Sequence, residues 1–208
     1  KVTRNGETVL DCTPGWYRAT QSNSKEVDMS SRGAVVWRPG QYILTDAAGN
    51  EKKFEAKEKA VPVSGPWELA FEPGWDTPAK IELKKLIPLT KHPNQAVKYY
   101  SGTVAYQSTL NVPDGFGDNV ILDLGEVVDI AEVWLNGKRV GTRWAPPFHY
   151  DVSKYIKSGT NHLTIKATNT WRNQMIYDAA RPKGKKKTWT SRPLRNSKEL
   201  PSPSGLMG

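Results

Sequence analysis

The stretch "VWLNGKRVG", residues 133–141, decides the fold class. Asn136-Gly137 lies between two runs of strand-forming residues. Asn-Gly is the strongest short signal for a two-residue type I′ hairpin, because both central residues of that turn need positive φ. We therefore predict two antiparallel strands joined at this turn. The second strand leads into an aromatic and proline-rich loop, "WAPPFHY" at residues 144–150, which we expect to form a rim or to plug one end of a sandwich.

Period-two alternation of apolar and polar residues extends through the rest of the chain. Val104, Tyr106, Leu110 and Val112 fall on one side of residues 102–112, and polar residues fall on the other. The same alternation recurs at Trp67, Leu69 and Phe71, at Val120, Leu122 and Leu124, and at Leu163, Ile165 and Ala167. This pattern is typical of strands with one face on a core and one toward water. Apart from one helical turn at residues 153–157, capped by Asp151 or Ser153, no helix is expected.

These signals predict an all-β chain with a jelly-roll β-sandwich, preceded by a small β unit. The composition changes at residues 55–66, "EAKEKAVPVSGP", so we place a boundary near residue 60. Residues 1–60 would be a small β unit or the tail of a preceding β domain, and residues 61–180 would be the sandwich. Residues 181–208 would be a basic, Pro- and Ser-rich segment without regular structure. Because the chain starts at Lys1 within a strand-like pattern, we interpret it as a piece of a longer protein.

Composition and charge exclude several classes of protein. No apolar run reaches the roughly 18 residues that a membrane span requires, so no membrane partner is expected. Cys12 is the single cysteine, which rules out an internal disulfide, and we expect it to be a half-buried small residue. The net charge of +9 comes mainly from residues 181–208, which hold eight Lys and Arg against Glu199. The main body is nearly neutral, so a nucleic-acid partner is not expected. The basic run at residues 181–189 would be a solvated loop or a surface that attracts an acidic polysaccharide.

Several ordered motifs resemble a known family. Residues 131–141, 148–152 and 159–169 are similar to the conserved motifs of the sugar-binding β-sandwich of family 2 glycoside hydrolases. A closer resemblance, to the C-terminal sandwich of family 106 α-L-rhamnosidases, is carried by "GPWELAF" (65–71), "KYYSG" (98–102), "WAPPF" (144–148), "NTWRNQMIYD" (169–178) and "SGLMG" (204–208). The match covers roughly residues 63–178 and the last few residues. It departs from the rhamnosidase pattern at residues 173–178, where "NRLIGD" would be expected.

The resemblance implies a galactose-binding-like jelly roll that carries no catalytic residues, because the acid and the nucleophile or base of these enzymes lie on a separate barrel. The chain would then be a non-catalytic accessory sandwich of a polysaccharide-degrading, rhamnosidase-like enzyme. It would act with the catalytic domain of the same chain on a plant or algal polysaccharide or its oligosaccharides, in a secreted or periplasmic bacterial protein. A structural calcium ion is also implied. The alternatives are an autonomous carbohydrate-binding module for an acidic polysaccharide and a purely structural domain that packs on the barrel.

The residue types suggest where a sugar would bind. A sugar site needs an exposed aromatic face with amide, carboxylate or guanidinium groups beside it. The loop at 144–150 and the segment at 169–178 supply this mixture, and the candidate carbohydrate-binding residues are Trp144, His149, Trp171, Arg172, Asn173, Tyr177 and Asp178. The competing interpretation places the tryptophans in the core or at the sandwich end. In that case Arg172, Asn173 and Asp178 would form a buried polar network.

Overall fold

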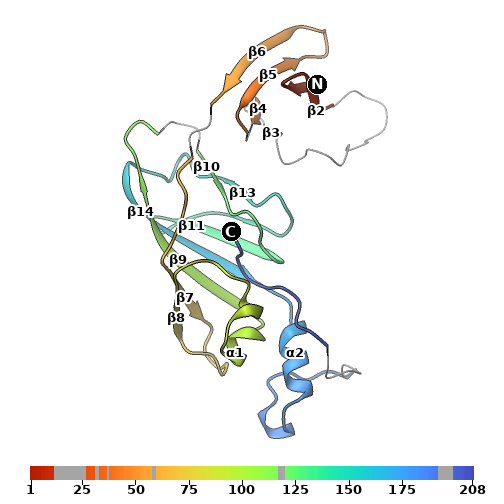
Figure 1. The fold of residues 1–208 in the computed structure, drawn as a ribbon, viewed down its shortest axis with the longest axis vertical. Helices are drawn as coiled ribbons and strands as arrows, with labels where there is room; N and C mark the ends of the chain where they lie inside the picture. The colour runs from red at the N-terminus through yellow and green to blue at the C-terminus, as the bar shows by residue number, and fades with distance from the viewer. Residues whose placement is uncertain (12–26, 31–32, 37, 58–59, 117–119, 192–198) are drawn as a thin grey trace. The chain divides into compact units, whose positions relative to one another are not determined.

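The computed structural model describes residues 1–11, 27–30, 33–36, 38–57, 60–116, 120–191 and 199–208. Cys12 lies outside these residues, so its predicted half-burial stays a prediction. The chain divides into two compact units, Lys1–Ala60 and Val61–Gly208 (Figure 1). Each unit has its own hydrophobic core, and each is described separately below.

The first unit consists of short antiparallel strands. A four-stranded sheet has the order β2-β1-β5-β6, and β3 pairs with β4 in a separate hairpin. The strands are β1 (Val2–Arg4), β2 (Glu7–Leu10), β3 (Val27–Ser30), β4 (Gly33–Val36), β5 (Gly40–Thr45) and β6 (Glu51–Ala56). Tyr42 is almost fully buried and stacks on Phe54 with ring centroids 5.4 Å apart. It belongs to a small core that also contains Val2, Val9 and Val27. The turn at residues 46–50 joins β5 to β6, and Asp46 accepts hydrogen bonds there from the backbone N–H groups of Ala48 and Asn50.

The second unit is the predicted β-sandwich. A six-stranded antiparallel sheet has the order β12-β11-β14-β9-β7-β8, and β10 pairs with β13 separately. The strands are β7 (Trp67–Phe71), β8 (Lys80–Leu83), β9 (Thr103–Val112), β10 (Ile121–Asp123), β11 (Ile130–Leu135), β12 (Lys138–Arg143), β13 (His149–Asp151) and β14 (Gly159–Thr168). The alternation predicted the buried face of the large sheet correctly: Val104 and Tyr106 of β9 and Ile165 of β14 are at most 1% exposed. This face packs against apolar residues from the β10–β13 layer, such as Phe148 and Tyr150. The all-β sandwich prediction is confirmed.

The hairpin that opened the sequence argument has the predicted turn. Asn136 and Gly137 both have positive φ, at 52° and 76°, and join β11 to β12 with Leu135 opposite Lys138. The Asn136 side chain also donates to the carbonyl of Tyr155 and to the side chain of Asn161. Asn161 is fully buried and further bonds the backbone of Lys157, so two motifs far apart in sequence close the same end of the sandwich.

The C-terminal segment completes the core of the second unit (Figure 1). Leu206 is 1% exposed, forms an isolated β-bridge with Val127, and donates its backbone N–H to the buried Tyr106 hydroxyl. The Ser204 carbonyl accepts a bond from the Leu89 N–H. Although it contributes no extended strand, the end of the segment predicted to be irregular is therefore a packed part of the sandwich.

The prediction that the chain has no helix apart from the turn at residues 153–157 is wrong. The structure contains α1 (Gln95–Lys98) and α2 (Arg172–Ala179), with 3-10 turns η1 (Leu89–Lys91) and η2 (Lys183–Lys185). The buried positions of α2 are mostly polar, at Asn173, Gln174, Ile176 and Asp178. Because hydrophobic periodicity is the main helix signal in a sequence, a helix that buries amides and a carboxylate escapes it. The helical turn predicted at residues 153–157 is a single turn in which Ile156 N–H donates to the Val152 carbonyl.

Candidate functional site

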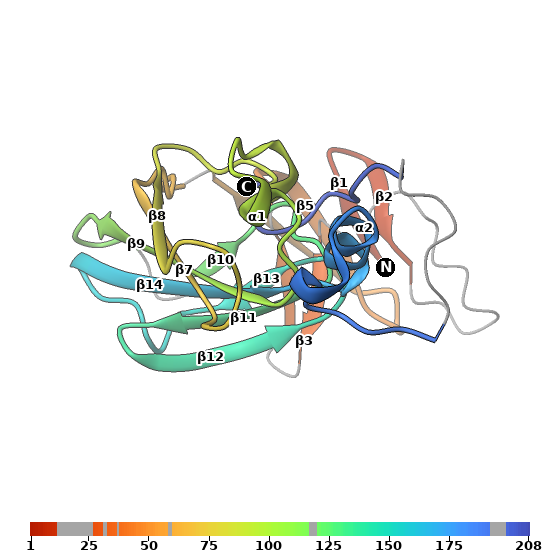
Figure 2. The same ribbon diagram turned by 90° about the horizontal axis from the view of Figure 1, so that it is seen from below.

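An open groove of about 510 Å³ lies over β12, β13 and the loop between them. Strand β12 is the edge strand of the six-stranded sheet, so its outer side is open (Figure 2). The groove is lined by Val140, Gly141, Thr142, Arg143, Trp144, Ala145, Pro146, His149, Tyr150 and Asp151. We refer to it as the Trp144 groove, because the Trp144 side chain is 80% exposed and presents its indole to solvent.

Polar groups around the Trp144 groove are held in fixed positions. The Arg143 guanidinium lies 5.8 Å from the Tyr150 ring centroid, and the Tyr150 hydroxyl donates to the Ala131 carbonyl at 2.7 Å. Burial raises the pKa of Tyr150 to about 12, so this phenol stays a donor at neutral pH. His149 is buried, with Nε2 3.5 Å from the Asp123 carboxylate. The groove therefore combines an exposed aromatic face with a guanidinium group and, from Asp151, an exposed carboxylate.

The second group of predicted residues lies on or beside α2. Trp171 is 59% exposed, and its ring centroid lies 5.9 Å from that of Trp75 in the loop between β7 and β8. Arg172 binds Glu199 and Ser202, at 2.8 and 3.1 Å. The side-chain amide of Asn173 exchanges two hydrogen bonds with the backbone of Ser202. These two polar side chains thus fasten the C-terminal segment to α2.

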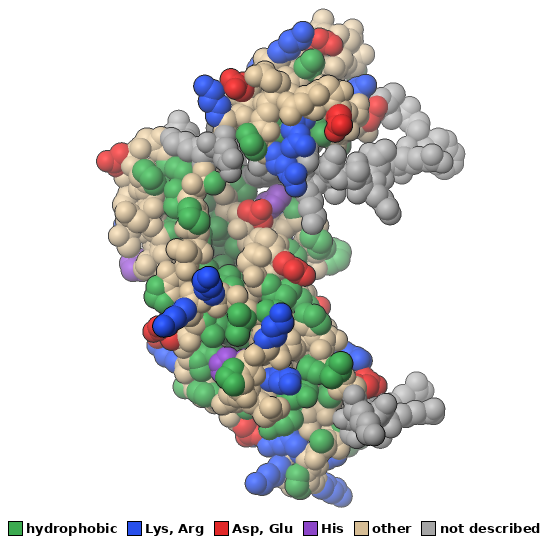
Figure 3. Space-filling model, in the orientation of Figure 1, with side chains coloured by type: hydrophobic (Ala, Val, Ile, Leu, Met, Phe, Trp, Pro, Cys, Tyr) green, Lys and Arg blue, Asp and Glu red, His purple; other side chains and the backbone are tan. Residues whose placement is uncertain are grey.

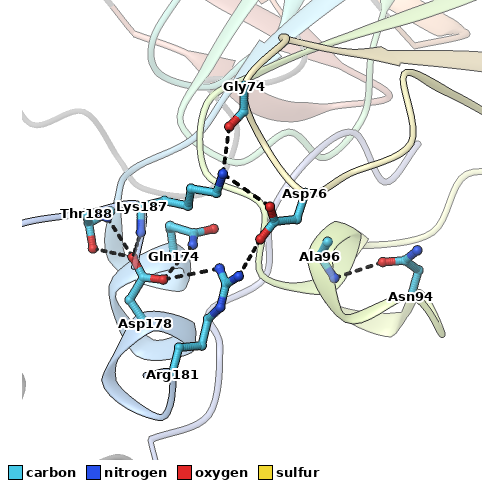
Figure 4. A network of polar contacts seen from close by, with 9 residues as sticks. All are labelled: Gly74, Asp76, Asn94, Ala96, Gln174, Asp178, Arg181, Lys187 and Thr188. Carbon is cyan, nitrogen blue, oxygen red and sulfur yellow. Dashed lines mark hydrogen bonds and ion pairs between the residues drawn. The ribbon is translucent and has the colours of Figure 1, made fainter. Parts of the chain in front are cut away.

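Asp178 is the centre of a buried polar network (Figure 4). It is 3% exposed, and its Oδ2 accepts bonds from the backbone N–H groups of Lys187 and Thr188 and from the Thr188 hydroxyl. Its Oδ1 accepts a bond from Gln174 and lies 3.5 Å from the Arg181 guanidinium. Every Asp178 oxygen is therefore engaged within the same unit, and the segment that follows α2 is held against the helix.

A second carboxylate, Asp76, ties that segment to the loop between β7 and β8 (Figure 4). Arg181 donates to Asp76 at 2.5 Å, and Lys187 Nζ lies 3.2 Å from it while also bonding the Gly74 carbonyl. The hydrogen bond from Arg181, assisted by Lys187, holds the pKa of Asp76 below its ordinary value. Arg181 also lies over the Tyr177 ring, which stacks on Tyr99 with centroids 5.1 Å apart.

The seven predicted sugar-binding residues therefore fall into two groups. Trp144 and His149 line the Trp144 groove, whereas Trp171, Arg172, Asn173, Tyr177 and Asp178 lie on or beside α2. Sugar binding by either group stays a prediction. The sequence did not reveal Arg143, Asp151 or Trp75, because their positions depend on how β12 meets β13 and how the β7–β8 loop meets α2.

Within the described residues, no group of three or more His, Cys, Asp or Glu side chains could hold a metal ion. These residues offer no side-chain cage for calcium, and the calcium expectation stays a prediction. Among the same residues, no helix has the length and hydropathy that crossing a bilayer requires.

One family model matches most of the chain. Residues 35–190 match the family model described as "Glycosyl hydrolases family 2, sugar binding domain". Two curated proteins of Formosa agariphila, both named provisionally as beta-glucuronidases, are 33% identical over 171 residues and 24% identical over 181 residues. Each alignment covers 78% of this chain but only 15% and 17% of the relative.

A solved structure resembles most of the chain. The rhamnosidase from Novosphingobium sp. PP1Y matches with a TM-score of 0.69 and 35% identity, over 84% of this chain and 16% of that protein. The chain thus spans less than a fifth of the length of each of these relatives.

Proposed function

The chain belongs to the sugar-binding domain family of the family 2 glycosyl hydrolases, and from this premise we propose that it is a non-catalytic accessory β-sandwich of a larger, rhamnosidase-like enzyme. Its role would be to contact a plant or algal polysaccharide, or an oligosaccharide from it, through the Trp144 groove. Its partner would be a catalytic domain in the same polypeptide, and the whole enzyme would work outside the bacterial cytoplasm.

One observation carries the sugar-contacting role: Trp144 is 80% exposed within a groove that also contains Arg143 and Asp151. Carbohydrate sites pair an exposed aromatic face with a few placed polar groups, and the Trp144 groove has both. The indole would stack on the C–H face of a sugar ring, while the guanidinium and carboxylate would bind hydroxyl groups.

Hydrogen bonds and ion pairs made by several acidic side chains within the fold support a non-catalytic role. Glycoside hydrolysis needs two carboxyl groups across one bond, and the general acid needs a raised pKa. Here a hydrogen bond from the Trp134 indole, followed by Arg139, lowers the pKa of Glu132. The pKa of Asp76 is also lowered, by the hydrogen bond from Arg181. The Asp178 carboxylate is occupied by hydrogen bonds from α2 and from the segment after it. Glu132 and Asp76 are therefore held ionised by structural partners rather than kept protonated for acid catalysis.

The rhamnosidase-like assignment rests on the structural match, which covers 84% of the chain at 35% identity. The names of the curated relatives point to glucuronides instead, so the test includes both sugars. The purely structural alternative is favoured by the way that Arg172 and Asn173 bind the chain's own C-terminal segment.

Calorimetry tests the groove directly. The full chain would be titrated with rhamnose- and glucuronate-containing oligosaccharides, alongside Trp144→Ala and Trp189→Ala variants. Trp189 is 89% exposed and does not line the groove, so it is the matched control. Trp144→Ala should weaken binding about tenfold or more, as loss of a central aromatic anchor does, and Trp189→Ala should not. Equal losses of affinity in the two variants, or no binding heat from the folded chain at millimolar sugar, would contradict sugar binding in the groove. Either result would favour the purely structural alternative.

Hydrolysis assays test the other half of the proposal. The purified chain should release no product from aryl α-L-rhamnosides or aryl β-D-glucuronides above the rate of buffer alone. Turnover that survives repurification and scales with protein concentration would contradict the non-catalytic role.

A further inference from the structure

We infer that the end of the sandwich that carries α2 is a second carbohydrate surface, selective for anionic polysaccharides that bear carboxylate or sulfate groups. It consists of Trp75, Trp171, Lys183, Lys185 and Lys186, and we call it the cationic–aromatic end. The inference rests on the proposed function only for the class of partner, a polysaccharide. It does not depend on the Trp144 groove.

The basic loop is held in a defined conformation. After α2, the chain forms η2 and returns to Thr188, whose N–H and hydroxyl both bind the buried Asp178 carboxylate. The Lys187 N–H binds the same carboxylate, and Lys187 Nζ reaches Asp76. A loop whose backbone is anchored by a buried anion loses less backbone entropy when its lysines bind a ligand.

The lysines of η2 are available to a ligand. Lys183, Lys185 and Lys186 are exposed. Within the described part of the chain, their ammonium groups form no ion pair, whereas Arg181 pairs with Asp76 and Asp178, and Lys187 pairs with Asp76. Asp76 and Asp178 thus compensate the two inner cations, Arg181 and Lys187, and leave the charge of the three outer lysines uncompensated among the described residues. In Figure 3, Lys and Arg side chains gather at the tip where Figure 1 places α2 and η2.

An aromatic pair adjoins the lysines. Trp171 precedes α2, is 59% exposed, and lies against Trp75. Trp75 is followed directly by Asp76, the carboxylate that binds Arg181 and Lys187. Trp75 is therefore joined through Asp76 to Arg181 and Lys187, the two residues that flank the three outer lysines in the sequence.

This combination fits an anionic sugar chain. An indole face stacks on the C–H face of a pyranose ring, and ammonium groups pair with the carboxylates or sulfates that such chains carry. Nucleic acid fits less well, because proteins that track a phosphate backbone carry a basic stripe or channel. Here most of the net positive charge lies in residues 181–208, and the body before them is nearly neutral.

The test uses affinity electrophoresis and calorimetry of the full chain with four probes: polygalacturonate, a sulfated galactan, an unsulfated galactan and single-stranded DNA. The test variant is Lys183→Gln/Lys185→Gln/Lys186→Gln. The matched control, Lys52→Gln/Lys53→Gln/Lys57→Gln, removes the same charge from exposed positions in the first unit. Trp171→Ala tests the aromatic part, and Trp144→Ala tests the groove separately.

We expect the chain to bind one or both anionic polysaccharides more tightly than the unsulfated galactan, with an affinity that falls as salt rises. Whichever anionic probe binds identifies the charged group. The η2 triple variant should bind about tenfold more weakly, the sum expected of three exposed ion pairs, and the control triple variant should bind as the wild type does. Trp171→Ala should also weaken binding.

Three outcomes would overturn the inference: equal affinity for charged and uncharged galactan, equal loss in both triple variants, or tighter binding of DNA than of either anionic glycan. Loss in the η2 variant with none in Trp144→Ala would support the inference, and the groove would still be tested separately by the oligosaccharide titrations. Loss in Trp144→Ala alone would overturn the inference.

Discussion

Gly205 shows how a single backbone position controls the closure of the sandwich. Its φ is +92°, and a Cβ at this position would overlap the Tyr106 hydroxyl and lie 3.1 Å from Leu89 Cγ. Both neighbours are buried, at 0% and 1% exposed, so neither moves without disturbing the core. The "SGLMG" motif therefore has a structural reason for its glycine: only a residue without a side chain lets Leu206 reach the core.

Gly205→Ala should lower the free energy of unfolding by about 2–4 kcal/mol, because backbone strain and overpacking add. Gly74→Ala is the matched control, since Gly74 has φ of +90° but no heavy atom within 4 Å of the added Cβ. Gly74→Ala should lower the free energy of unfolding by only about 1–2 kcal/mol, because it adds backbone strain without overpacking. Urea denaturation of both variants measures the difference, and equal losses would show that Gly205 is not tightly packed.

At the scale of the elements, the ion pair between Asp76 and Arg181, which follows α2, predicts that the stability of the fold depends on pH. The hydrogen bond from Arg181 lowers the pKa of Asp76 below 3.8, so ionised Asp76 stabilises the fold above that pH. The contribution is lost as the pH falls through the lowered folded-state pKa. Asp76→Asn should therefore reduce stability at pH 6, while the difference from the wild type should vanish under strongly acidic conditions.

Because Asp76 is 42% exposed, this effect is that of a surface ion pair, at most about 1 kcal/mol. Urea titrations at pH 6 and at pH 2.5 measure it. Glu82→Gln, which removes an exposed carboxylate from nearby β8, should leave the profile unchanged. A stability difference for Asp76→Asn that persists or grows in acid would contradict the role of this ion pair.

The elements also show what sequence patterns capture and what they miss. Alternation predicted β7, β9 and β14, because each has one face on the core and one face toward water. The Asn-Gly dipeptide predicted the β11–β12 hairpin, because its φ requirement is local. Helix α2 was not predicted from the sequence, because the helix is held by side-chain hydrogen bonds to residues 10 to 29 positions further along the chain. Local patterns carry no information about such partners.

At the scale of the whole molecule, the motifs identified the family, but they did not assemble a site. Trp144 and Trp171 were both predicted to face sugar, and both are exposed. They lie in different settings, one in a groove over β12 and β13 and the other beside Trp75 and the basic loop. The sequence suggested the residue types that sugar recognition needs, while only the fold shows which of them share a surface.

Nuclear magnetic resonance of the tryptophan indole N–H groups tests the central claim most directly, since each of the eight tryptophans of the ¹⁵N-labelled chain reports separately. Titration with an uncharged, rhamnose-containing oligosaccharide should shift the Trp144 signal in a saturable way. The signal of Trp67, which is 2% exposed in the core, should stay fixed. A Trp144 signal that does not move at sugar concentrations where binding heat is measured, while other indoles shift, would contradict sugar recognition at the Trp144 groove.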